Sequence, residues 1–175
     1  MNRLATRLIL VAGTLIASSA FAVMPQVKSP MPESPGELLV MHADHPVMHR
    51  AIRRARAELA DFLELAESPR AHQEKFAVRV MLLERNEAEY IWVSDFKQDD
   101  NSLFAGVVSG DIHMQSRFKR GDRFTFLRGD IVDWTYTDAR KGRVHGAYTE
   151  CALLTLAPPE VAARTRKKLK LDCEF

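Results

Sequence analysis

Between residues 46 and 66 the apolar positions recur at steps of three and four, as one face of an α-helix requires. These apolar positions are Met48, Ile52, Ala55, Leu59, Phe62 and Leu63. Charged residues fill most of the other positions. Asp44 can cap the first turn, Pro46 lies where a missing N–H costs nothing, and Pro69 lies beyond the end. The pattern therefore predicts one amphipathic helix from Pro46 to about Ala66.

After residue 70 the apolar positions change to the alternation of β-strands. The predicted strands cover residues 76–83, 89–96, 103–109, 123–127, 131–137 and 146–156. The links between them are short and rich in Asn, Asp and Gly, which favours antiparallel neighbours. Pro158-Pro159-Glu160 then opens a last helix, whose basic residues from Arg164 to Lys170 complement the dipole at its C-terminal end.

The segment before the first helix is rich in proline. Because proline removes a backbone donor and disrupts helices, residues 23–43 are predicted to be an extended tether without chemistry. Leu38 to Met41 could add a short edge strand there, although so short an apolar run also fits a helix. Residues 44–175 are predicted to form a single α+β domain. It combines a mainly antiparallel sheet of five or six strands with an N-terminal amphipathic helix and a C-terminal helix.

The first 22 residues have the form of an export signal. Arg3 and Arg7 are followed by an apolar run and then by Ala20-Phe21-Ala22, a small-x-small cleavage site. The apolar run is about ten residues long, whereas a membrane-spanning helix needs roughly 20. We therefore expect cleavage between Ala22 and Val23, no permanent membrane anchor, and a soluble periplasmic or secreted protein.

Cleavage would also change the charge balance. The expected signal holds two of the 25 basic residues and none of the 23 acidic ones, so the rest of the chain has 23 of each. A chain with zero formal net charge lacks the basic surface expected of a nucleic-acid-binding protein. Nucleic acid is therefore not an expected partner.

Cys151 and Cys173 are the two cysteines of the chain. In an oxidising compartment they are expected to form one disulfide. Two separately buried thiols are the alternative, because the sequence does not place their Cα atoms within bridging distance.

Several different short motifs follow one another along the chain at a recognisable spacing. They are Asp44, Met48, Ala51, Ala55-Arg56, Phe62, Phe76-Ala-Val-Arg-Val80, Trp92, Phe104-Ala-Gly106, Gly121-Asp122, Ile131-Val-Asp-Trp134 and Gly146-Ala-Tyr-Thr149. This pattern resembles the YegJ-like family of small bacterial proteins, also called domain of unknown function 2314. The resemblance extends from Asp44 to about Leu154 and supports the predicted fold and export. It implies no mechanism, because the family has no assigned chemistry.

Two groups of side chains raise the question of chemistry. His42, His45 and His49 have partly metal-like spacing, but two nitrogens on one helix face do not complete a site, so solvent-facing histidines are favoured. Asp133 and Glu150, with Asp130, could supply a pair of carboxylates for hydrolysis if they converged in a cleft.

A structural role is preferred for two of these carboxylates. Asp130 lies in a predicted turn, and strand alternation directs Asp133 to the face opposite Trp134. No Gly-x-Ser-x-Gly elbow surrounds Ser94, Ser109 or Thr149, and no Gly-rich phosphate loop is present.

Aromatic residues complete the set of candidate contacts. Trp92 is expected in the core, and Trp134 and Tyr136 are expected to pack against the helix rather than form an exposed patch. The basic residues 164–170 could contact an anionic lipid or partner, but a solvated helix end explains them equally well. The candidate contact residues are Trp92, Asp133, Trp134, Tyr136, Tyr148 and Thr149.

The leading hypothesis is a non-enzymatic periplasmic binding or interaction module without a cofactor. It would hold a protein or small envelope ligand on a sheet surface and on the turns of residues 131–149. The alternative is an envelope hydrolase with Asp133 or Glu150 as acid or base. The two differ in whether titratable groups meet in a concave pocket.

Overall fold

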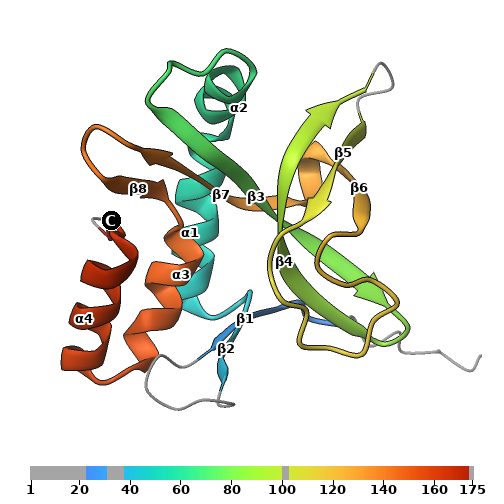
Figure 1. Ribbon diagram of the computed structural model, residues 1–175. Helices are drawn as coiled ribbons and strands as arrows, with labels where there is room; N and C mark the ends of the chain where they lie inside the picture. Colours follow the sequence, from blue (N-terminus) through green and yellow to red (C-terminus); the bar gives the residue numbers. More distant parts are fainter. Residues whose placement is uncertain (1–22, 31–37, 100–102, 174–175) are drawn as a thin grey trace, which may run out of the picture.

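The computed structural model describes residues 23–30, 38–99 and 103–173. The expected signal, residues 1–22, lies outside the described residues. The described part is an α+β fold in which helices pack against a curled, mixed sheet (Figure 1). The α+β class is thus confirmed, whereas the expectation of five or six mainly antiparallel strands is too simple.

Within the described residues the sheet has eight strands. They are β1 (Gln26–Pro30), β2 (Leu38–His42), β3 (Gln73–Glu84), β4 (Glu87–Gln98), β5 (Leu103–Val108), β6 (Arg123–Leu127), β7 (Ile131–Asp138) and β8 (Arg143–Gly146). The helices are α1 (Pro46–Ala57), α2 (Leu59–Glu67), α3 (Tyr148–Leu153) and α4 (Pro159–Leu169), with 3-10 turns η1 (Arg128–Asp130) and η2 (Leu154–Leu156).

The sheet has the order β2-β1-β4-β3-β7-β8, and β5 and β6 continue from β4. The start of β4 pairs with β1 in parallel, and its second half pairs with β5. Because β1 joins the sheet, the segment expected to be a tether is in part a structural strand. Pro25 and Pro30 flank or end this strand, where proline is tolerated.

The expected helix over residues 46–66 is in fact two helices. They meet at Glu58, which ends α1 and begins α2. The apolar spacing continues across the break, so the pattern alone does not reveal it. The cap also differs from the expectation: His45 rather than Asp44 is the N-cap, and its Nδ1 accepts a hydrogen bond from the Val47 amide.

The strand expected over residues 146–156 is wrong. Gly146 and Ala147 both have positive φ, which ends β8, and α3 begins at Tyr148. A short buried apolar run is compatible with either element, and here the residues from Tyr148 to Leu154 are buried except for Glu150. The predicted last helix is confirmed as α4.

The main core lies between α1, α2 and the strands β3 and β7. Trp134 is 7% exposed, and its ring stacks on Phe62 with centroids 4.8 Å apart. Its Nε1 donates to the carbonyl of Ala55 at 2.9 Å. The expected packing of Trp134 against the helix is therefore confirmed.

The disulfide between Cys151 and Cys173 is present, with Cα atoms 5.5 Å apart. It joins α3 to the segment that follows α4. The C-terminal helix is thereby fixed to the element that carries Thr149 and Glu150.

Candidate functional site

A buried arginine lies at the centre of the molecule. Arg79, on β3, is only 2% exposed. Its guanidinium donates to the carbonyls of Tyr90 and Lys28 and to the side chains of Thr149 and Glu150. One side chain thus connects β1, β3, β4 and α3, and we call Arg79 with these partners the arginine hub.

Asp133 completes the hub from the neighbouring strand. The register of β3 and β7 places it opposite Arg79. Its carboxylate is fully buried and accepts hydrogen bonds from the Trp134 amide and from both the amide and the hydroxyl of Thr149. The Thr149 hydroxyl therefore links Asp133 to Arg79, because it donates to one and accepts from the other.

Burial raises the pKa of the Asp133 carboxyl to about 6. The hydrogen bonds from Thr149 and Trp134 and the charge of Arg79 act in the opposite direction, but desolvation is the larger effect. Strand alternation directs Asp133 and Trp134 to opposite faces of β7, but both side chains are buried, because α3 covers the face of Asp133. With both oxygens bonded and no exposed surface, Asp133 holds α3 on the sheet.

Local geometry requires glycine where α3 begins. A Cβ on Gly146 would lie 2.1 Å from the Trp134 carbonyl oxygen, and the residue has φ +76°. Glycine tolerates both conditions. The tight connection brings Thr149 and Glu150, in the first turn of α3, directly over Arg79.

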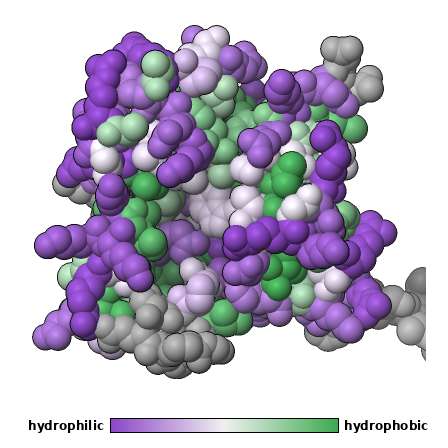
Figure 2. Space-filling view, viewed as in Figure 1, coloured by the Kyte–Doolittle hydropathy of each residue, from purple (hydrophilic) through white to green (hydrophobic). Residues whose placement is uncertain are grey.

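A cleft of about 160 Å³ opens beside the hub. We call it the central cleft, and among its lining residues are Lys28, Arg79, Trp92, Asp111, His113 and Glu150. The face in Figure 2 is hollowed near its centre, between the side of α3 and α4 and the side of β4 to β6. A volume this small suits a small polar group rather than a drug-sized molecule.

Glu150 is fixed in this cleft through one oxygen. Its Oε1 accepts from Arg79 Nη1 at 2.9 Å and from Trp92 Nε1 at 3.3 Å, and Trp92 also lies 5.2 Å from the Arg79 guanidinium. The side chain is 19% exposed. Among the described residues, Oε2 has no hydrogen-bond partner, and Glu150 lines both the central cleft and a neighbouring cavity of about 210 Å³.

His113 is held in a similar way by a buried carboxylate. Glu89 is 1% exposed and contacts His113 Nδ1 at 2.8 Å. It also accepts from the amides of His113 and Met114, and Lys28 Nζ lies 3.8 Å away. His113 is 18% exposed, and its Nε2 bonds to no other described residue. The central cleft is thus lined by two partly exposed polar side chains, and each has one atom bonded to a described residue and a second atom without such a bond.

The remaining candidate residues have structural positions. Tyr148 is buried, and its hydroxyl donates to Glu58. Tyr136 is half-buried, stacked between Phe76 and His145. Trp92 is half-buried at the edge of the cleft, so its expected place in the core is only partly correct.

Other candidates do not join this site. Asp130 accepts a hydrogen bond from the Leu127 amide in a turn, as expected. His45 caps α1, and His42 contacts Gln26. In the described ranges no three His, Cys, Asp or Glu residues are placed to hold a metal ion. No helix there is both long and apolar enough to span a membrane.

Sequence reasoning missed Arg79, Glu89 and His113. A weak signal was available for the first two, since each charged residue lies within or next to a run of strand-forming apolar residues. Such a charge can lie on a solvent-exposed face or be buried with partners, and the sequence does not distinguish these cases. No local signal marked His113, which lies in a loop.

Comparison with known proteins places the chain in a family. Residues 45–170 match the model of DUF2314, described as an uncharacterized protein conserved in bacteria. The chain belongs to the DUF2314 family. It is 32% identical over 126 residues to the uncharacterized protein YegJ of Escherichia coli (strain K12). The aligned region covers 72% of this chain and 79% of that protein. No solved structure matches the chain.

Proposed function

We propose that this DUF2314 protein is an exported, non-enzymatic binding module that holds a small polar ligand of the cell envelope in the central cleft. The supporting observation is the pair of anchored side chains, Glu150 and His113. Each has one atom bonded to a buried partner, and each side chain lines the cleft. A ligand would meet groups that are already oriented, so little side-chain freedom would be lost on binding.

The charge and shape of the cleft limit the chemical class of the ligand. Glu150 offers an acceptor, Lys28 offers a donor, and Trp92 offers an aromatic surface. His113 donates from Nδ1 to Glu89, so its Nε2 is an acceptor in the neutral ring. These groups suit a molecule with at least one donor and one acceptor within a few bonds. The buried motif residues Asp133, Thr149 and Trp134 would then support the cleft from behind instead of contacting the ligand.

The test is a titration followed by NMR. The probes are glycine, diglycine, glucosamine and glucuronate, which present a zwitterion, a peptide, an amine and an acid. We expect at least one probe to shift the resonances of His113 and Trp92 in the native chain. Glu150→Gln and His113→Asn should each weaken the binding of that probe. Glu160→Gln and His49→Asn, on exposed helix positions, should not.

Thermal melting of each variant distinguishes loss of binding from loss of folding. If no probe shifts cleft resonances, or if the cleft variants bind as well as their controls, the proposed site is wrong. Probes that shift only distant resonances would also argue against it.

One observation favours a hydrolase as the second candidate. A histidine oriented by a buried carboxylate lies in the same cleft as Glu150, and such a pair can transfer protons. Incubation with purified cell-wall sacculi tests this directly. Release of soluble fragments by the native protein, abolished in Glu150→Gln, would replace the binding proposal with hydrolysis.

A further inference from the structure

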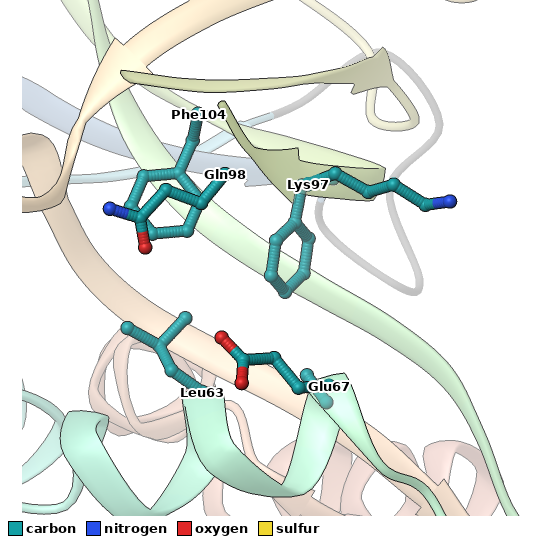
Figure 3. A pocket seen from close by; sticks show the side chains of 7 residues that line it. Leu63, Glu67, Lys97, Gln98 and Phe104 are labelled. Carbon is teal, nitrogen blue, oxygen red and sulfur yellow. The ribbon is translucent and has the colours of Figure 1, made fainter. Parts of the chain in front are cut away.

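A second concave region lies where the end of α2 faces β4 and β5. Two cavities there, of about 320 and 530 Å³, share Ala66 and Phe96. We call them together the α2–β4 groove, and Figure 3 shows the smaller cavity. Both volumes fall in the range of small-ligand sites, and neither cavity shares a lining residue with the central cleft.

The strands that form the larger cavity are locally distorted. Lys75 on β3 and Asp95 on β4 have φ of 58° and 49°, although neither is glycine. Both line the larger cavity, and each lies at an interruption of strand register. Bulges and unfavourable backbone angles occur preferentially at binding sites, because they redirect side chains.

Glycine on the next strand keeps this distortion in place. A Cβ on Gly106 would lie 2.6 Å from Val93 Cγ1 and 2.7 Å from the Ser94 carbonyl oxygen. Only glycine allows β5 to approach the irregular part of β4 so closely. The groove is therefore a fixed feature of the fold.

Aromatic rings form a continuous floor. Phe62 contacts Phe76 and Phe96 with ring centroids 5.9 and 6.1 Å apart, and Phe96 is 6.3 Å from Phe104. Phe62 lies on the buried face of α2, whereas Phe76 and Phe96 are half-buried. Their faces offer a rigid apolar surface within the groove.

Hydrogen-bonding groups border this floor. In Figure 3 the Glu67 carboxylate and the Gln98 amide extend into the gap between α2 and β4, and the Lys97 ammonium points away from it. Neither Glu67 nor Gln98 bonds to another described side chain. Asp95 and Ser94 add oxygen atoms along the larger cavity. The border is therefore rich in acceptors.

We propose that the α2–β4 groove binds a neutral oligosaccharide. A pyranose ring has an apolar face of C–H groups that can pack on phenylalanine rings, and its edge carries hydroxyl donors for carboxylate and amide oxygens. The charged residues of the lining, Glu67 and Asp95 against Lys75 and Lys97, balance in number, which favours a neutral chain over a strongly charged one. β4 pairs with β3 only as far as Ser94, so an extended peptide is the competing occupant, which the tetra-alanine probe tests. The aromatic rings and the side-chain acceptors favour the saccharide.

The test is calorimetric titration of the protein expressed from its full-length chain. The neutral probes are chitotetraose and cellotetraose, and the comparison probes are the deacetylated, cationic chitotetraose and tetra-alanine. We expect a neutral probe to bind at millimolar or lower concentration and to shift amide resonances of Phe96, Gln98 and Phe104.

Variants then test whether the saccharide binds in the α2–β4 groove. Glu67→Gln and Gln98→Ala should each weaken binding roughly tenfold or less, as loss of one hydrogen bond implies. Gln115→Ala and Glu160→Gln are the matched exposed controls, and Glu150→Gln tests independence from the central cleft. All three should bind like the native protein, and melting curves confirm that every variant folds.

Three results would overturn the proposal. They are no binding of either neutral probe, stronger binding of the cationic or peptide probe, and unchanged affinity in both groove variants. Failure of the central-cleft proposal would leave these outcomes unaffected, because the two sites have separate linings.

Discussion

The stability of the protein as a function of pH tests how Asp133 is held in the arginine hub. Burial raises the pKa of this carboxyl from 3.8 to about 6. The folded state therefore binds the proton more tightly than the unfolded state does. The resulting stabilisation is fully present below about pH 4 and is lost as the pH rises through 6. A shift of this size corresponds to about 3 kcal/mol.

The comparison variant is Asp133→Asn, which keeps the shape and does not titrate. The free energy of unfolding is measured by urea denaturation at intervals between pH 4 and pH 8 for both proteins. The difference between their free energies of unfolding isolates the contribution of Asp133, because the other groups titrate in both proteins. We expect the native protein to lose up to about 3 kcal/mol relative to the variant over this interval. Asp61→Asn, on the exposed face of α2, controls for removal of one negative charge.

A difference between the two curves that does not change with pH would refute this reasoning. It would mean that Arg79 and the three hydrogen bonds compensate fully for desolvation. A change of the opposite sign, with the native protein gaining stability as the pH rises, would mean that these interactions outweigh the desolvation of Asp133.

Four further outcomes are expected. Trp134→Ala should lower the free energy of unfolding by about 3 to 5 kcal/mol in urea denaturation, since it empties a core position, and unchanged stability would contradict the packing. Arg79→Met should cost about 3 to 5 kcal/mol by the same measurement, because buried carboxylates lose their cation, whereas a neutral effect would remove the hub from the account. Mass spectrometry of unreduced protein should show two hydrogens fewer than the dithiol, and replacing Cys151 and Cys173 should cost about 3 kcal/mol for a loop of 22 residues. N-terminal sequencing should begin at Val23, and a full-length protein in the membrane fraction would contradict export.

Periodicity predicted much of the fold. The alternation over residues 131–137 and the proline-led start of α4 both specify their elements locally, and both are present. The break at Glu58 was not predictable from spacing, because the apolar stripe continues through it. The helix α3 was missed because a buried run of apolar residues satisfies a strand or a helix equally well.

The site was less predictable than the fold. Trp92 and Glu150 were singled out from the sequence, but their convergence depends on the turn at Gly146 and on the parallel pairing of β1 with β4. Arg79 and Glu89 belong to strands and resemble solvent-facing charges until the chains that cover them are known. Long-range pairing of this kind leaves no local pattern in a single sequence.

The central claim, that the central cleft holds a small polar ligand, is tested most directly by native mass spectrometry. The protein is isolated from the cells that produce it and sprayed under non-denaturing conditions, alongside Glu150→Gln and the control Glu160→Gln. We predict an additional non-covalent small-molecule mass on the native protein and on the control, and its loss from Glu150→Gln. The protein mass alone in all three samples, or the same adduct on Glu150→Gln, would contradict the claim.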